Sequence, residues 1–221
     1  MQEVKHTEQA WDCATGNGQV ALELANYFKE VNATDISQAQ LDQAETRENI
    51  HYSISRAEQT NFPDSTFDLI TVAQAIHWFD FGAFYREVRR VSKPGGILAV
   101  WGYGVMQFAD HQINEQLQHF YCVVTNPYWD PERRYLDEAY QTIPFDLPEI
   151  NIPETFAIEQ SFTLASLQGY LNTWSAVKKM QQKTSPKDPV GEFISGLQEY
   201  WPVAAMQPAT FPIHLRVGRV E

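Results

Sequence analysis

The sequence has little that could build a disulfide framework, a membrane span or a nucleic-acid surface. Its two cysteines, Cys13 and Cys122, lie far apart and form no C-x-x-C pair, which argues against a disulfide framework and a thiolate zinc site. The longest apolar-leaning run, residues 95–106, contains four glycines and is far shorter than the roughly 20 residues that cross a bilayer. Sixteen Lys and Arg against 28 Asp and Glu give a net charge of -12, which disfavours contact with nucleic-acid phosphates.

These absences favour a small-molecule partner over a membrane or a nucleic acid. The first residues also lack the charged-then-apolar plan of a signal peptide, so we expect a cytoplasmic protein. With 43% hydrophobic and 13% aromatic residues, the chain has enough apolar side chains for a sizeable core. Its 221 residues correspond to one domain, because a domain takes about 150 residues.

The first half of the sequence alternates between apolar, β-branched segments and segments with helical spacing. A parallel sheet with helices on both faces is typical of such alternation. The expected strands are residues 8–13, 31–35, 50–55, 67–73 and 97–103, and the expected helices are residues 19–30, 38–47 and 82–91.

The pattern changes after about residue 104. Residues 126–153 hold five prolines and no clean period, which indicates an insertion. The last segment, residues 211–220, alternates apolar and polar side chains, and we expect it to close the sheet as an antiparallel strand. We also expect helices at residues 110–123, 164–177 and 191–200, with a polar stretch at residues 178–188.

A candidate ligand site follows the first three expected strands. After the first strand comes Asp12-Cys13-Ala14-Thr15-Gly16-Asn17-Gly18, in which glycines would let a ligand approach the backbone closely. Asp35 ends the second strand, where a carboxylate can accept hydrogen bonds from a ribose diol, and Glu58 follows the third. A nucleoside lying across the carboxyl edge of a parallel sheet needs ligand-facing groups at successive strand ends.

With these residues the sequence resembles the class I S-adenosylmethionine-dependent methyltransferases, specifically the small-molecule group that includes trans-aconitate methyltransferase. The family motif is an acidic residue followed by three alternating glycines, and this chain has Asp12, Ala14, Gly16 and Gly18, with alanine at the first glycine position. The segments Phe62-Pro63-Asp64-Ser65-Thr66-Phe67-Asp68, Ala73-Gln74-Ala75-Ile76-His77-Trp78-Phe79-Asp80 and Lys93-Pro94-Gly95-Gly96 are also similar to the family.

The resemblance implies a Rossmann-like three-layer sandwich with a seven-stranded, mostly parallel sheet whose last strand is antiparallel. It implies one methyltransferase domain over residues 1–221, with a cofactor-binding half at residues 1–105, substrate-side helices at 106–210 and a closing strand at 211–221. Family members carry a few tens of residues before the first strand as helices over the cofactor. This chain has about eight there, so we expect part of that cover to be missing.

The cofactor that the resemblance implies is S-adenosylmethionine, with S-adenosylhomocysteine as the product. The expected cofactor-binding residues are Asp12, Ala14, Gly16, Gly18, Asp35, Ile36, Ala57, Glu58, Gln74 and Ala75. No metal is expected, because the sequence has no evident carboxylate cluster.

The methyl acceptor is expected to be a small molecule, with a carboxylic acid as the guess that the family suggests. A carboxylate is ionised at neutral pH and needs no base, whereas for a hydroxyl or amine acceptor His77 is the candidate catalytic base. The sequence leaves open whether the acceptor site is formed by aromatic residues, namely Trp101, Tyr103, Tyr128, Trp129 and Trp174, and whether an arginine binds the acceptor, namely Arg133, Arg134 or Arg216.

Two other functions remain open from the sequence. Gly16-x-Gly18-x-x-Ala21 with Asp35 also fits the dinucleotide fingerprint of a nicotinamide-dependent oxidoreductase, although no Tyr-x-x-x-Lys pair occurs. Ala14 is compatible with a methyltransferase-like protein that binds without catalysis. The oligomeric state is open as well, and an uncovered cofactor cleft would offer a second copy a surface to occupy.

Overall fold

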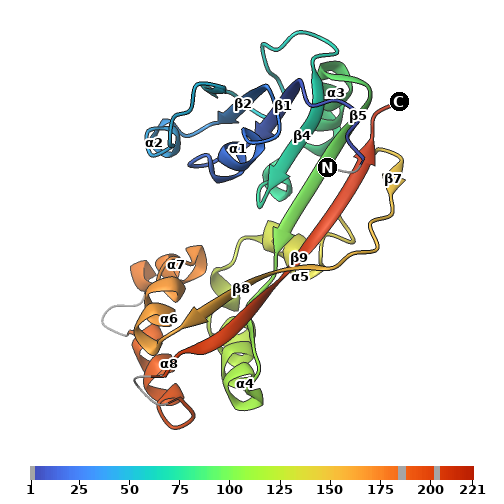
Figure 1. Cartoon of the computed structure of the whole chain (residues 1–221). Helices are drawn as coiled ribbons and strands as arrows, with labels where there is room; N and C mark the ends of the chain where they lie inside the picture. Colours follow the sequence, from blue (N-terminus) through green and yellow to red (C-terminus); the bar gives the residue numbers. More distant parts are fainter. Residues whose placement is uncertain (1–2, 184–187, 202–204) are drawn as a thin grey trace. The chain divides into compact units, whose positions relative to one another are not determined.

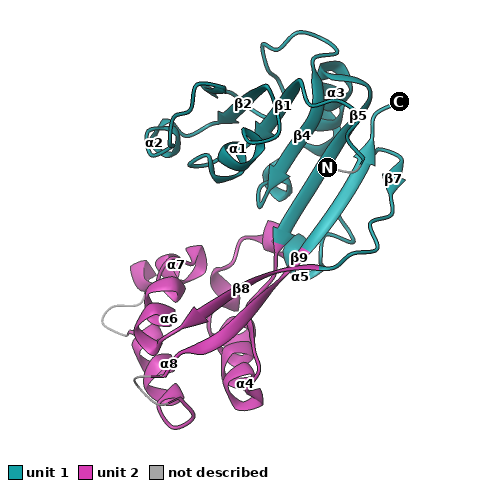
Figure 2. Cartoon of the chain, in the orientation of Figure 1, with its two compact units in different colours: residues 1–102, 135–155, 214–221 teal, residues 103–134, 156–213 magenta. Residues whose placement is uncertain are grey.

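The chain divides into two compact units in a computed structural model that describes residues 3–183, 188–201 and 205–221. Unit 1 comprises residues 1–102, 135–155 and 214–221, and unit 2 comprises residues 103–134 and 156–213 (Figure 2). The candidate site belongs to unit 1.

Unit 1 is built on a sheet whose central strands are parallel. Their order is β3 (Ile50–Ile54), β2 (Glu30–Asp35), β1 (Gln9–Cys13), β4 (Phe67–Ala73) and β5 (Ser92–Tyr103). Figure 1 shows β2, β1, β4, β5 and β9 side by side in this order. In β4, six of the seven residues are buried, five of them apolar or β-branched, as expected for a strand covered on both faces.

The last strand, β9 (Gln207–Arg219), runs antiparallel to β5. Backbone hydrogen bonds join Gly95 to Val220 and Gly104 to Pro212, so the residue numbers rise along β5 while those of the paired β9 residues fall. The short β7 (Glu149–Ile150) pairs antiparallel with β9. The described residues form a sheet of nine strands, whereas seven were expected, because further short strands pair with β9. The mostly parallel order with an antiparallel closing strand and the Rossmann-like α/β class are confirmed.

Helices cover both faces of this sheet, because successive apolar side chains along its strands point to opposite faces. On one face, Trp11, Ile70 and Leu98 pack with residues of α3 (Phe81–Val91). On the other face, the neighbouring positions Ala10, Leu69 and Ile97 pack with residues of α1 (Gln19–Leu24). The remaining helices of the first half are α2 (Gln38–Leu41) and the 3-10 turn η1 (Ile76–Trp78), and α5 (Arg134–Asp137) lies in the expected insertion.

Unit 2 has a core of its own, formed by helices on a short antiparallel sheet. The sheet consists of β6 (Gln107–Phe108), β8 (Phe156–Phe162) and the first part of β9. The helices are α4 (His111–His119), α6 (Leu164–Leu171), α7 (Ser175–Lys183) and α8 (Pro189–Leu197), with the π-helical turn η2 (Phe120–Val124) and the 3-10 turns η3 (Asn126–Tyr128) and η4 (Pro131–Arg133).

Three sequence expectations differ from the structure outside the site. Residues 178–183 are helical as the second part of α7, where a polar stretch was expected, because Val177 and Met180 pack into the core of unit 2. The rest of that stretch, residues 184–187, lies outside the described residues. The expected helix at residues 164–177 is interrupted at 172–174, and β8 was not expected.

Candidate functional site

The loop after β1 has a left-handed backbone at three alternating positions. The φ angles are +56° at Ala14, +57° at Gly16 and +82° at Gly18. Left-handed backbone is cheap for glycine and strained for alanine, so Ala14 keeps the loop shape at an energetic cost. A side chain at Gly18 would collide with the hydroxyl of Tyr52, which lies against this turn. The loop then enters α1, whose first hydrogen bond runs from Leu22 N–H to the carbonyl of Gly18.

Asp35 ties the end of β2 to this loop. One carboxylate oxygen accepts a hydrogen bond from the N–H of Gly16 at 2.9 Å, and the other accepts from the N–H of Ser37 at 2.9 Å. A carboxylate has about four acceptor sites on its two oxygens, so two bonds leave room for hydroxyl donors from a ligand. Asp35 also lines the pocket described below.

Asp12 lies beneath the loop rather than in its opening. It is 1% exposed and accepts hydrogen bonds from the hydroxyls of Thr15 and Thr71. Burial disfavours its charged form and raises the pKa of Asp12 to about 6, against the lowering effect of the two threonines. Asp12 is thus a buried carboxyl that stabilises the loop through Thr15, and it is not among the residues that line the pocket.

The segment after β3 carries an ion pair at the pocket. The Nε atom of Arg56 lies 3.4 Å from a carboxylate oxygen of Glu58, and the second oxygen of Glu58 accepts from the N–H of Asp80 at 3.2 Å. The side chain of Arg56 is 77% exposed and that of Glu58 is 15% exposed. Ala57, between them, is buried.

The segment after β4 forms the remaining wall. Gln74 has a left-handed φ of +55°, and its N–H donates to the carbonyl of Trp101 on β5. The turn η1 follows and leaves the indole of Trp78 57% exposed, whereas His77 is buried. The Nδ1 atom of His77 lies 3.1 Å from the hydroxyl oxygen of Tyr140.

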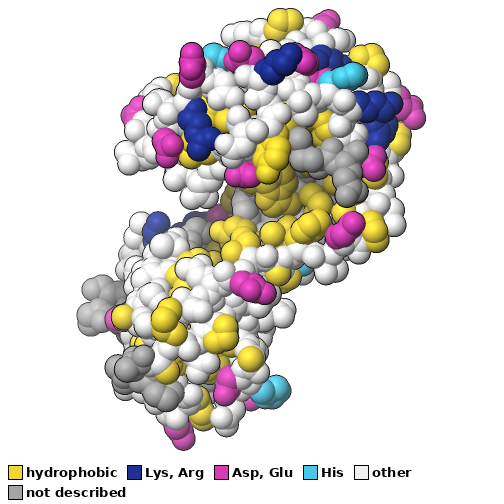
Figure 3. Space-filling model, viewed as in Figure 1, with side chains coloured by type: hydrophobic (Ala, Val, Ile, Leu, Met, Phe, Trp, Pro, Cys, Tyr) yellow, Lys and Arg dark blue, Asp and Glu magenta, His cyan; other side chains and the backbone are white. Residues whose placement is uncertain are grey.

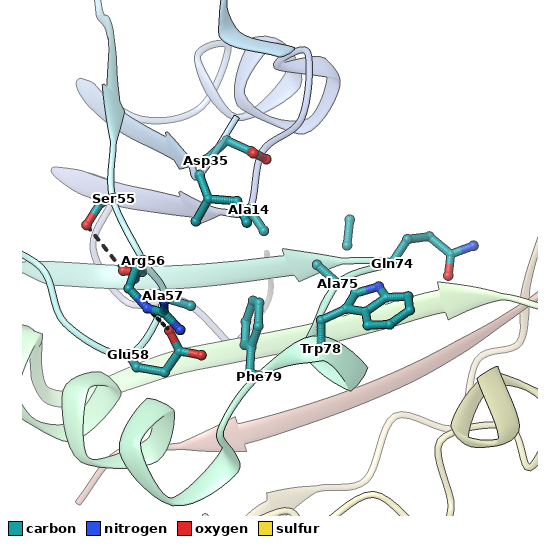
Figure 4. A pocket seen from close by; sticks show the side chains of 12 residues that line it. Ala14, Asp35, Ser55, Arg56, Ala57, Glu58, Gln74, Ala75, Trp78 and Phe79 are labelled. Atoms are coloured by element: carbon teal, nitrogen blue, oxygen red, sulfur yellow. Dashed lines mark hydrogen bonds and ion pairs between the residues drawn. The ribbon is translucent and has the colours of Figure 1, made fainter. Parts of the chain in front are cut away.

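These three segments and Asp35 enclose a pocket of about 330 Å³, which is within the size range of small-molecule sites. Figure 4 shows Ala14 and Asp35 on one side of it and the rings of Trp78 and Phe79 on the other. The lining residues are Ala14, Asp35, Ile36, Ser55, Arg56, Ala57, Glu58, Ala73, Gln74, Ala75, Trp78 and Phe79.

Seven of the ten expected cofactor-binding residues line this pocket, namely Ala14, Asp35, Ile36, Ala57, Glu58, Gln74 and Ala75. The other three, Asp12, Gly16 and Gly18, shape the loop beside it, and His77 is also absent from the lining. Sequence reasoning missed Ser55, Arg56, Ala73, Trp78 and Phe79 as lining residues, although each directly neighbours an expected residue or the segment that contains one. Ser55 and Ala73 lie at or directly after strand ends, and this was the available signal for them. Trp78 and Phe79 belong to the segment 73–80, which the sequence analysis singled out as similar to the family.

Several of the arginines and aromatic residues considered for the acceptor have structural partners. In unit 1, Arg216 binds both carboxylate oxygens of Glu149 at 2.7 and 2.8 Å. In unit 2, the guanidinium of Arg133 lies over the ring of Trp129, 4.8 Å from its centroid, and its Nε donates to the hydroxyl of Tyr121. Trp174 packs against Trp129 and Tyr121.

The described residues contain no group of three or more His, Cys, Asp or Glu side chains that could hold a metal ion. Within residues 3–183, 188–201 and 205–221, no helix is long and apolar enough to cross a membrane. On the face that Figure 3 shows, Lys and Arg side chains lie in separate small groups with acidic side chains among them.

Comparison with known proteins agrees with this geometry. The sequence model of a family described as a methyltransferase domain matches residues 11–100. A Dictyostelium discoideum protein, provisionally named a methyltransferase, is 32% identical over 219 residues, which cover 96% of this chain and 82% of that protein. A methyltransferase of Aspergillus candidus is 31% identical over 157 residues, covering 62% of this chain and 49% of its own.

A solved structure from Anaeromyxobacter dehalogenans, provisionally named a type II methyltransferase, superposes with a TM-score of 0.90 at 34% identity. The match covers 99% of this chain and 92% of that one. The matched family model begins at Trp11 in β1 and ends at Val100 in β5, so it contains every strand end that lines the pocket. The chain belongs to the class I S-adenosylmethionine-dependent methyltransferases.

Proposed function

We propose that this protein transfers the methyl group of S-adenosylmethionine to a small-molecule acceptor and that the pocket of unit 1 holds the cofactor. The observation that carries the proposal is the hydrogen bond between Asp35 and the N–H of Gly16, because it joins an acidic strand end to a glycine loop at the pocket. S-adenosylmethionine is the cofactor of the family to which the chain belongs.

The residues at the pocket fit this cofactor in chemistry. Asp35 has acceptor capacity left for the two hydroxyls of a ribose, and Ile36, which is 74% exposed, offers an apolar surface to a base. Ala57 and Ala75 contribute small side chains, so a flat ring would find space between Ile36 and the segment after β3. Asp35 and Glu58, together with a net charge of -12, favour a cationic ligand over a pyrophosphate.

When bound, S-adenosylmethionine supplies an electrophilic methyl group on a sulfonium. The protein contributes to such a displacement by aligning the acceptor with the methyl group and by excluding water. Effective molarities of well-oriented reactions show that alignment lowers the activation barrier by about 7–11 kcal/mol in favourable cases. The exposed indole of Trp78 and the ring of Phe79 are apolar groups at the pocket that can exclude water from a bound ligand.

We further propose a small carboxylic acid as the first acceptor class to test. A carboxylate acceptor requires no proton removal, which agrees with a pocket lining that contains no histidine or lysine. For a hydroxyl or amine acceptor the sequence points to His77 as the base, but His77 is buried and does not line the pocket, so this role is the less favoured one. The two acceptor classes differ in their pH dependence, because a base with a histidine-like pKa adds an acidic limb to the rate profile.

Isothermal titration with S-adenosylmethionine and S-adenosylhomocysteine, with NAD as the control, tests the cofactor assignment. Micromolar binding of the first two and none of NAD supports the proposal, and Asp35→Ala should weaken that binding. Acceptors are then screened by S-adenosylhomocysteine formation, starting with di- and tricarboxylic acids. A folded protein that binds neither sulfur compound contradicts the proposed activity, and binding of both without turnover on any acceptor favours a binding role.

A further inference from the structure

The pocket segment Gln74–Phe79 has a buried imidazole at its centre. Gln74, Ala75, Trp78 and Phe79 line the pocket, whereas His77 turns inward and is only 6% exposed. A buried polar side chain requires a hydrogen-bond partner, since an unmet one costs about 1–3 kcal/mol. The hydroxyl of Tyr140, 3.1 Å from Nδ1 of His77, provides such a partner from a part of the chain 63 residues away.

The backbone that carries Tyr140 is held in an unfavourable conformation. Ala139 and Tyr140 have φ angles of +53° and +59°, and left-handed backbone is unfavourable for residues other than glycine. Two such residues in succession persist only where the surroundings enforce them. The side chain of Tyr140 is fully buried, so the strained turn has the effect of directing its hydroxyl into unit 1 toward His77.

The side chain of Arg216 stabilises this turn. The guanidinium of Arg216 donates to the carbonyls of Tyr140 at 3.2 Å and Ile143 at 2.8 Å, and it binds Glu149 through two further bonds. It also lies 4.4 Å from the centroid of the Phe145 ring. Arg216 therefore fixes the turn that positions Tyr140, and its side chain is only 15% exposed.

A glycine on β5 makes room for this arrangement. A side chain at Gly102 would lie 2.8 Å from the hydroxyl oxygen of Tyr140, 2.8 Å from Oε1 of Gln74 and in collision with Leu136. The missing side chain thus lets Tyr140 and the first residue of the pocket segment approach the same point of β5. The printed hydrogen bond between Tyr140 and this segment is the one to His77.

We propose that Tyr140 is a positioning residue, which holds the pocket segment Gln74–Phe79 in its ligand-binding form through the imidazole of His77. The inference rests on the proposed function in that the ligand of the pocket is S-adenosylmethionine. Tyr140 itself does not line the pocket, and its effect is transmitted by the hydrogen bond to Nδ1 of His77.

The test compares Tyr140→Phe with Tyr85→Phe by titration with S-adenosylhomocysteine. Tyr85 is a matched control, because its side chain is equally buried and its hydroxyl donates to the carbonyl of Pro144 at 3.0 Å, away from the pocket lining. Both variants lose one buried hydroxyl and similar stability. We expect Tyr140→Phe to weaken S-adenosylhomocysteine binding about threefold to tenfold and Tyr85→Phe to change it less than about twofold.

A double variant separates transmission through His77 from a general structural effect. In a His77→Asn background, Tyr140→Phe should leave the affinity for S-adenosylhomocysteine unchanged, because the transmitting imidazole is already gone. Should Tyr140→Phe fail to fold, Arg216→Lys, which cannot hold both carbonyls and Glu149, takes its place in the comparison with Tyr85→Phe.

Unaltered binding by folded Tyr140→Phe, or an equal loss in both backgrounds, would overturn the positioning role. Failure of the wild type to bind S-adenosylhomocysteine would instead contradict the proposed function, so the two failures are distinguishable.

Discussion

Replacing Ala14 by glycine should stabilise the protein, although the substitution removes a side chain. Ala14 has a φ of +56°, and a left-handed conformation costs an L-residue about 1–2 kcal/mol relative to glycine. Glycine loses more backbone entropy on folding, which offsets about 0.4–1 kcal/mol of this gain. The net gain is therefore about 0.8 kcal/mol, or a rise in Tm of about 2–3 °C for a chain of this length.

Two other glycine substitutions serve as controls in the same urea and thermal unfolding experiments. Ser65 also has a left-handed φ, +51°, is exposed and does not line the pocket, so Ser65→Gly should give a similar gain. Ala25 has a right-handed backbone with φ -61°, so Ala25→Gly should lower the free energy of unfolding by about 0.4–1 kcal/mol. If Ala14→Gly destabilises the protein as Ala25→Gly does, the strain assigned to Ala14 is refuted.

Three further predictions concern residues at and near the pocket. Asp35→Ala should weaken S-adenosylhomocysteine binding by about 1–3 kcal/mol, measured by titration, and an unchanged Kd would remove Asp35 from the site. Because burial raises the pKa of Asp12 from 3.8 to about 6, the native state binds more protons than the unfolded state between these values, so stability falls as pH rises from 4 to 6. Asp12→Asn should abolish this dependence. The free energy of unfolding of the variant relative to that of the wild type should therefore grow by about 2 kcal/mol between pH 4 and pH 7 in urea titrations. A difference independent of pH would contradict the raised pKa. Gly102→Ala should destabilise the protein by about 1–3 kcal/mol through overpacking. Gly169→Ala, which places a methyl group in open space on α6, should instead stabilise the protein by about 0.5–1 kcal/mol. Equal effects of the two substitutions in thermal unfolding would argue against crowding at Gly102.

The parallel half of the fold was predictable because its signals are local. β4 begins and ends at the expected residues, since a short apolar, β-branched run between turn formers has few alternatives. The helices there were overestimated in length: α1 ends at Leu24 although helical spacing continues to Phe28. Phe28 is nevertheless buried, so a turn brings it into the same core that a longer helix would have served.

The unpredicted parts depend on contacts distant in sequence. β8 has Phe156, Ile158 and Phe162 at alternate positions, but its first six residues are exposed and its strand character comes from pairing with β9, about 50 residues later. Similarly, nothing local shows that Tyr140 reaches His77 or that Arg216 holds the turn between them. The candidate residues at strand ends could be identified from the sequence, because parallel strands end at one edge of the sheet. That Arg56 and Trp78 also line the pocket could be recognised only in the structure.

The bond between Asp35 and Gly16 N–H has a consequence for the energetics of ligand capture. The carboxylate is oriented by the polypeptide itself, through Gly16 and Ser37, so its rotamer is selected during folding. Freezing such a side chain on association would otherwise subtract about 0.5–1.5 kcal/mol from the affinity. The pocket is in this respect preorganised. The conformational entropy of the Asp35 side chain is lost when the protein folds, so that it does not reduce the affinity for the ligand.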